Sequence, residues 1–298
     1  MEELNLETCL GSISGWCDDI HVLDSGSTDR TLDIANRHAH HTHFHPYVDH
    51  ASQIDYAIRS LPFRFEWLLL LDADRTVTED LKAGIESALM HHRSDENGFY
   101  VAHRNLFRGR RVRGLNSWRL VLFRRSLARV DDSELVDCRV RTPGVVGYLR
   151  GAIVEYNRKE NDIDFWIDKH QRFASRLAAE EALRRVGRLR WSVKPRLFGN
   201  PDERIVWLKS RWLSMPLLVR PFLYFGYRFF LRFGFMDGVN GLTFHILQAL
   251  WFRLIVDVKV MELLRRIHSG ELLPEDLANS YRRPKQADLS GQDALPAR

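Results

Sequence analysis

The fold class of this chain is indicated by the stretch Glu66-Trp67-Leu68-Leu69-Leu70-Leu71-Asp72-Ala73-Asp74. A short apolar run that ends in charged residues is typical of a buried strand in a parallel sheet. Ligands of open α/β sheets bind at the carboxyl ends of such strands, where Asp72 and Asp74 fall. Residues at i and i+2 of an extended chain point to the same side. The two carboxylates therefore predict a site for a divalent cation, and for a diphosphate bound through it.

The strand in front of Asp72 is what makes this pair informative. An Asp-x-Asp sequence occurs about once by chance in a chain of this length. A second copy stands at residues 162–164, and we interpret it as the start of a helix.

The composition is that of an ordinary globular protein. The 298 residues are enough for one large or two small domains, with 45% hydrophobic residues, 28% charged residues and a net charge of +5. Arginine is dense at 104–129 and 172–232, where it alternates with apolar stretches. No nucleic-acid-binding module is recognisable, so the expected partner of these regions is a membrane surface and not nucleic acid.

Cysteine use and hydropathy favour a cytoplasmic location. Cys9, Cys17 and Cys138 have neither pair spacing nor metal-ligand spacing, which fits a reducing compartment. No signal peptide is recognisable at Met1. No stretch reaches about 18 uncharged apolar residues, so a transmembrane helix is not predicted.

Apolar periodicity and turn residues predict alternating helices and strands. A strand at 19–23 ends in Asp24-Ser25-Gly26-Ser27-Thr28-Asp29, a tight turn in which Ser27 or Thr28 can cap the next helix. The other predicted elements are helices at 3–14, 51–60, 79–91 and 164–186, strands at 98–102, at 120–123 and ending near 149, and a loop or hairpin at 104–115.

A histidine-rich region lies between the first two predicted strands. It contains His38, His40, His41, His43, His45 and His50. A metal site needs ligands in fixed geometry, and no carboxylate stands at ligand spacing here. We interpret the region as a polar strand and loop, with metal binding as the less favoured alternative.

Residues 212–266 are rich in Phe, Leu and Trp and predict an amphipathic helical region. One apolar helical face is formed by Phe244, Leu247, Trp251, Leu254, Val258 and Met261. We expect this face at a membrane interface, with four cations near anionic headgroups: Arg220, Arg228, Arg232 and Arg253. The alternative is a helix that packs on the rest of the protein.

Taken together, these motifs resemble the family 2 glycosyltransferases of the GT-A fold, in the branch that builds lipopolysaccharide core and other bacterial surface glycans. The resemblance runs through roughly residues 2–265. It is carried by the order and spacing of several segments, namely 22–31, 63–74, 122–125, 146–149 and 166–172.

The resemblance implies a mostly parallel sheet flanked by helices, and an inverting transfer from a nucleotide-diphosphate sugar to a lipid-linked or surface-glycan acceptor. It implies that Asp24 and Ser25 bind the nucleotide, that Asp72 lies near the ribose and sugar, and that Asp74 binds Mg²⁺ or Mn²⁺. The implied location is peripheral, on the cytoplasmic face of the inner membrane.

The same resemblance divides the chain into three regions. Residues 1–160 are expected to form the nucleotide-sugar-binding and catalytic domain, and 161–270 a helical region that meets acceptor and membrane. Residues 271–298 are expected to be a polar, disordered tail.

Four features depart from the family pattern. We expect the sheet to lack the family's first central strand, because the match begins just after it. Ile54-Asp55 replaces the usual basic residue and Asn, and Arg75 replaces the usual acid. The segment that should end in the catalytic acid reads Val136-Asp137-Cys138.

An inverting enzyme needs a carboxylate that takes the proton of the acceptor hydroxyl. Asp137 is the acid nearest to the expected position, and Glu134 is the second candidate. A cysteine is a poor base, since its ordinary pKa is about 8.5. A catalytically weakened relative that acts as a binding or scaffold subunit therefore remains an alternative. A nucleotidyltransferase is disfavoured, because no Gly-rich, Lys-containing loop opens the chain.

Overall fold

The computed structural model describes residues 1–131, 133–136 and 138–281. The strands are β1 (His21–Asp24), β2 (His41–Phe44), β3 (Trp67–Leu69), β4 (Arg75–Val77), β5 (Glu96–Phe107), β6 (Arg110–Arg124), β7 (Arg129–Asp131), β8 (Arg139–Arg141) and β9 (Val145–Glu155). The α-helices are α1 (Leu6–Gly11), α2 (Thr31–His38), α3 (His50–Ser60), α4 (Glu79–His91), α5 (Ile163–Arg185), α6 (Pro201–Ser214), α7 (Arg220–Gly226), α8 (Gly238–His245), α9 (Phe252–His268) and α10 (Pro274–Tyr281). Short 3₁₀ helices are η1 (Arg125–Leu127), η2 (Arg158–Asn161) and η4 (Gly234–Asp237), and π-helical turns are η3 (Tyr227–Leu231) and η5 (Ile246–Trp251).

The fold is mixed α/β, but the prediction of a mostly parallel sheet is wrong. The five-stranded sheet in the described part of the chain has the order β3-β6-β5-β9-β4, and its only parallel pair is β5 with β9. The parallel pair β1–β2 forms a separate sheet, and β7–β8 forms a third that is antiparallel. Among the described strands, β1 pairs only with β2, so the single sheet implied by the resemblance is divided.

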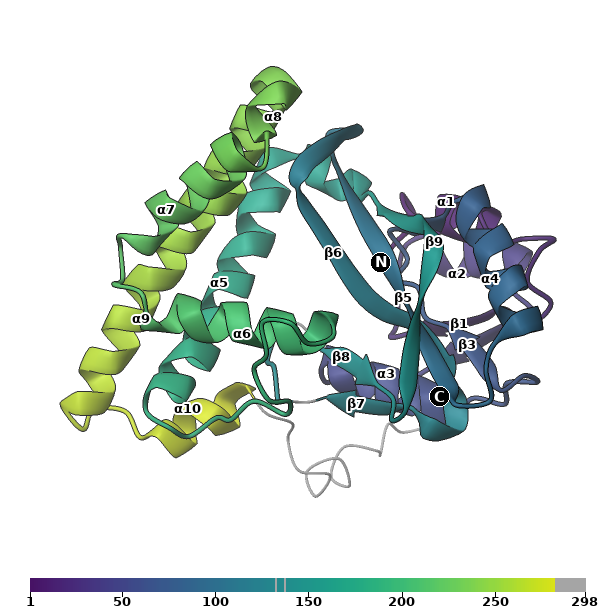
Figure 1. The fold of residues 1–298 in the computed structure, drawn as a ribbon, viewed down its shortest axis with the longest axis horizontal. Helices are drawn as coiled ribbons and strands as arrows, with labels where there is room; N and C mark the ends of the chain where they lie inside the picture. Colours follow the sequence, from purple (N-terminus) through teal and green to yellow (C-terminus); the bar gives the residue numbers. More distant parts are fainter. Residues whose placement is uncertain (132, 137, 282–298) are drawn as a thin grey trace, which may run out of the picture.

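A long hairpin accounts for the antiparallel pair at the centre of the sheet. β5 and β6 are joined at Arg108 and Gly109, which have φ values of 50° and 73°. Two successive positive φ angles are typical of the tight turns whose twist matches paired strands. A chain that returns directly by such a turn must run antiparallel to the strand it leaves. The predicted loop or hairpin at 104–115 is therefore a hairpin, and its strands are the longest in Figure 1.

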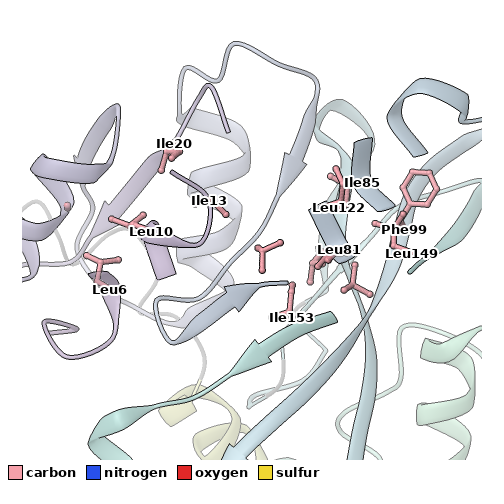
Figure 2. Packing of buried hydrophobic residues seen from close by; sticks show 14 of the residues in the cluster. Leu6, Leu10, Ile13, Ile20, Leu81, Ile85, Phe99, Leu122, Leu149 and Ile153 are labelled. Atoms are coloured by element: carbon pink, nitrogen blue, oxygen red, sulfur yellow. The ribbon is translucent and has the colours of Figure 1, made fainter. Parts of the chain in front are cut away.

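The main apolar core lies between the N-terminal helices and one face of the larger sheet (Figure 2). Leu6, Leu10 and Ile13 from the N-terminal segment belong to the same cluster as Leu81 and Ile85 of α4. Strand residues complete the cluster, including Phe99, Leu122, Leu149 and Ile153. The N-terminal segment is thereby held next to the strand that leads to Asp72, and Cys9 Sγ lies 3.6 Å from the carbonyl oxygen of Asp72.

Local signals located several helices correctly. The helix predicted at 79–91 is α4, and α3 begins one residue before its predicted start. The second Asp-x-Asp does begin a helix, because the Asp162 carboxylate accepts the backbone N–H of Asp164 at 2.9 Å. The predicted cap of α2 is wrong: the Ser27 hydroxyl donates to Asp24 at 2.6 Å, and the helix begins at Thr31.

The C-terminal helices pack on one another at the edge of the molecule opposite α1 and α2 (Figure 1). α5 and α9 share a core that contains Ala174, Ala178, Val256 and Val260. α10 lies within the region expected to be disordered, and it is ordered against α5 because Leu277 packs there. Within the described ranges, no helix is long and apolar enough to cross a lipid bilayer.

Two of the arginines expected near lipid headgroups are buried instead. Arg220 and Arg228 have no exposed surface. The Arg220 guanidinium donates to Asp257 of α9 at 2.9 Å and also pairs with Glu181 of α5. A buried cation needs such partners, because desolvation of an unpaired charge costs several kcal/mol. Arg220 therefore joins three helices and cannot contact a membrane surface.

The predicted apolar stripe is also divided between core and surface. Phe244 is buried against Phe107, and Trp251 is half-buried near Trp166. Val258 and Met261 are about half exposed. The region is helical as expected, but Ile246–Trp251 is a π-helical turn, and Phe107 and Val112 of the β5–β6 hairpin pack against the first part of the face.

Candidate functional site

A cavity of about 730 Å³ opens where β3 ends. Its walls come from the N-terminus of α3, the segment after β3, the middle of β6, the segment around β8, and the helices α5 and α6. A cavity of this size is in the range that holds small organic ligands and cofactors.

Asp72 and Asp74, the two aspartates of the predicted cation site, both line this cavity. They lie in the short segment between β3 and β4, whose ends are held by backbone hydrogen bonds. Arg75 N–H donates to the Asp72 carbonyl at 3.0 Å, and Tyr156 N–H donates to the Asp74 carbonyl at 2.9 Å. The second bond ties the segment to the end of β9.

A third carboxylate, that of Glu155, also lines the cavity, and it was not among the site residues predicted from the sequence. Glu155 ends β9 and is the register partner of Arg75 in β4. It lines the same cavity, and Arg75 Nε donates to it at 3.2 Å. The only local signal was an acid at the end of the apolar run 152–154. Its pairing partner could not be read from the sequence.

Arg75 neutralises part of the negative charge of these carboxylates. Its guanidinium lies 2.7 Å from the Asp72 carboxylate. Burial acts to raise the pKa of Asp72, but the surrounding positive charges, first Arg75, outweigh it and lower that pKa. Asp72 is therefore a carboxylate in an ion pair.

The pKa of Asp74 is shifted in the opposite direction from that of Asp72. Burial, and then the charges of Glu155 and Asp72, raise the pKa of Asp74 to about 7. Negative charge that is only partly neutralised is the setting in which a bound divalent cation relieves repulsion. Carboxylate oxygens are also the ligands that Mg²⁺ and Mn²⁺ prefer. The donor set of Asp72, Asp74 and Glu155 fits such a cation.

Asp24 and Ser25 are beside the cavity and do not line it. The Asp24 carboxylate accepts the backbone N–H groups of Gly26 at 2.7 Å and Ser27 at 2.8 Å. Burial acts to raise the pKa of Asp24, but these hydrogen bonds and that of the Ser27 hydroxyl lower it. The Ser25 hydroxyl accepts a hydrogen bond from Gln53 of α3, a helix whose first turn lines the cavity.

The predicted base, Asp137, lies outside the described residues. Its neighbours in the chain, Val136 and Cys138, both line the cavity. The second candidate, Glu134, also lines it but is buried in ion pairs. Lys209 Nζ lies 2.8 Å from the Glu134 carboxylate, and Arg139 Nε lies 3.8 Å from it.

Basic side chains line the cavity near the acidic group. Arg119 of β6 and Lys169 and Arg176 of α5 all line the wall. Burial acts to lower the pKa of Lys169, but its ion pair with Glu160 and the charges of Asp74 and Glu155 raise it. A cavity with carboxylates and several cations suits a ligand that carries phosphate and binds through a metal ion.

A search against models of known protein families finds no match to this chain. The functional proposal therefore rests on the sequence motifs and on the residues that line the cavity.

Proposed function

We propose that this protein is an inverting glycosyltransferase that moves a sugar from a nucleotide-diphosphate sugar to a lipid-linked or surface-glycan acceptor. The observation that supports this most is the grouping of Asp72, Asp74 and Glu155 in a cavity also lined by Arg119, Lys169 and Arg176. Carboxylates and cations that line the same cavity suit a diphosphate bound together with Mg²⁺ or Mn²⁺.

The roles proposed for the cavity residues follow from their positions, and those of Asp24 and Ser25 follow from the sequence resemblance. Asp74, with Asp72 and Glu155 beside it, would hold the cation. The cation, when bound, supplies positive charge that stabilises the diphosphate leaving group. Asp24 and Ser25 would bind the nucleotide next to the first turn of α3. Arg119, Lys169 and Arg176 would orient the phosphates.

Inversion requires a base on the acceptor side of the sugar. We propose Asp137 for this role on the sequence resemblance alone, since Asp137 lies outside the described residues. Glu134 is less suited, since its carboxylate is paired with Lys209. The base would take the proton of the acceptor hydroxyl as the hydroxyl attacks the sugar.

Purified protein incubated with Mn²⁺ and a panel of nucleotide sugars tests the proposal. We expect release of nucleoside diphosphate with one donor, and a loss of about 10²-fold or more in Asp74→Asn, because a charge at the leaving group is removed. Asp33→Asn, on the exposed surface of α2, is the matched control and should keep wild-type activity. Equal activity and equal metal dependence of wild type and Asp74→Asn would contradict the site.

A second candidate function is a weakened relative that binds nucleotide but does not turn over. Arg75 favours it, because its guanidinium pairs with both Asp72 and Glu155, where a cation would otherwise sit. Isothermal titration calorimetry with nucleoside diphosphate, with and without Mn²⁺, distinguishes an active transferase from a binding protein when it is combined with the turnover assay. Nucleoside diphosphate binding without Mn²⁺ dependence and without turnover of any donor would support the binding protein.

A further inference from the structure

The histidine-rich region forms a side-chain cluster that the proposed transfer reaction does not use. β1 and β2 run parallel, with His21 paired to His41 and Leu23 paired to His43. The ring centroid of His21 lies 4.6 Å from that of His41 and 5.1 Å from that of His43. Three imidazoles therefore share one face of this two-stranded sheet.

The carboxylate that local spacing lacked comes from the segment before β1. Asp19 Oδ1 lies 3.1 Å from His21 Nε2 and 4.0 Å from His41 Nε2. The three donor atoms all lie within 4.8 Å of one another. Ligand atoms of a tetrahedral Zn²⁺ ion are roughly 3.3 Å apart, given metal–ligand bonds of about 2.0–2.1 Å. A small movement of the His41 side chain, which is 50% exposed, would bring all three to that spacing.

We propose that Asp19, His21 and His41 form a Zn²⁺ site that joins β1 to β2, separate from the cavity at Asp74.

The surroundings of the cluster orient its ligands. Asp19 Oδ2 accepts the backbone N–H of Arg64 at 2.8 Å, so Oδ1 is the oxygen that faces the imidazoles. His21 Nδ1 lies 2.9 Å from His43 Nε2, a contact that fixes the ring and leaves Nε2 toward Asp19. Partners of this kind, on the atom of the ligand that does not touch the metal, fix its tautomer and orientation.

Access to the cluster comes from one side. The side chains of His21 and Asp19 are 1% and 5% exposed, and the Phe63 ring covers His21 at a centroid distance of 4.5 Å. His41 is the exposed ligand, so the ion would enter past it and keep a water molecule as fourth ligand. The Arg64 guanidinium donates to the carbonyl of Asp18 at 3.4 Å.

The position of the cluster separates it from the cavity. His21 begins β1, whereas Asp24 ends it, and none of Asp19, His21 and His41 lines the cavity. Two imidazoles and one carboxylate suit Zn²⁺ better than Mg²⁺, which prefers oxygen ligands only. The ion would add a link between β1 and β2, which pair with each other and with no other described strand.

Zn²⁺ titration against a chromophoric chelator tests the site in full-length, metal-stripped protein without a histidine tag. We expect one tight equivalent in wild type and none in His41→Ala, because loss of a ligand should cost more than the roughly 10- to 100-fold that loss of a ligand's hydrogen-bond partner costs. His38→Ala is the matched control, since His38 belongs to the same region but pairs with Glu7 at 3.7 Å, and it should bind as wild type does. Asp74→Asn should also retain the equivalent, because its carboxylate lies at the cavity.

Substitution with Co²⁺ provides a readout of geometry. Wild type should show the intense visible absorption of a four-coordinate ion, and His41→Ala should lose it while keeping the wild-type circular dichroism spectrum. No binding by wild type, or equal binding by wild type and His41→Ala, would overturn the proposal. If only Asp74→Asn lost metal binding, the ion would be at the cavity, and the proposed site at Asp19, His21 and His41 would equally be overturned. None of these results depends on whether the protein transfers sugar.

Discussion

Asp74 is the residue at which stability and the proposed function conflict. Its carboxyl is buried beside Glu155 and Asp72, which raises its pKa to about 7 from an ordinary value of 3.8. A raised pKa means that the folded state binds a proton more tightly than the unfolded state. The folded protein is therefore destabilised by Asp74 ionisation as pH rises from about 4 to about 7, and the full penalty is present above pH 7.

Asp74→Asn should remove this penalty. In metal-free buffer at pH 8 we expect the variant to be more stable than wild type by about 1–3 kcal/mol, and the difference should vanish near pH 3.5. Urea unfolding at the two pH values measures it. Mn²⁺ should raise the melting temperature of wild type and not that of Asp74→Asn. A stability difference that is the same at both pH values would show that Asp74 ionises normally.

At the scale of elements, the packing of α4 on β9 depends on a glycine. Gly151 has a φ of 92°, and a Cβ atom there would lie 2.3 Å from the backbone nitrogen of Leu81 and 2.5 Å from its Cα. The first turn of α4 thus rests directly on the backbone of β9. The end of the same strand carries Glu155, so this contact also helps to position the cavity.

Gly151→Ala should cost about 3 kcal/mol or more, because it combines a left-handed backbone with a collision against backbone atoms. Gly187→Ala is the control for backbone strain alone. Gly187 has a φ of 74° with nothing within 4 Å of its Cβ position, so its substitution should cost only about 1–2 kcal/mol. Urea unfolding measures the stability of both variants. Equal losses of stability in Gly151→Ala and Gly187→Ala would show that the α4–β9 contact can relax.

At the scale of the whole molecule, the exposed apolar side chains gather on one set of helices. Several of them are 54–80% exposed and belong to α7, η3 and α8, namely Phe222, Leu223, Phe230, Leu231 and Val239. These helices form the edge of the molecule farthest from α1 and α2 (Figure 1). Large apolar side chains that are exposed together on one part of a protein mark a protein or membrane contact. This grouping supports the proposed peripheral location, with Arg232 as an exposed cation nearby.

The double variant Phe230→Ser/Leu231→Ser should reduce co-sedimentation with anionic liposomes by about 10-fold or more, because each apolar side chain contributes about 1.5–3 kcal/mol when fully buried. Phe198→Ser is the control, since Phe198 is 97% exposed but lies between α5 and α6. Full-length chains are needed, because removing α9 would expose the core that it shares with α5. Sedimentation of wild type and double variant to the same extent would contradict the membrane contact.

The sequence by itself determined most of the helices and the place of the acidic pair. The bounds of α4 and the Asp162 cap of α5 follow from signals within a few residues. Asp72 and Asp74 marked the cavity because an apolar strand directly precedes them. Such features depend on local backbone preferences and side-chain period, which the chain carries regardless of its tertiary contacts.

The tertiary structure alone decided which distant residues meet. The direction of the sheet depends on which strands pair, and an apolar run is compatible with either direction. Glu155 reaches the cavity because β9 pairs with β4, and Asp19 meets His41 because β1 pairs with β2. Arg220 is buried because Asp257 and Glu181 face it from two other helices. Pairing across tens of residues is set by the burial and electrostatics of the whole fold, so no local pattern can specify it.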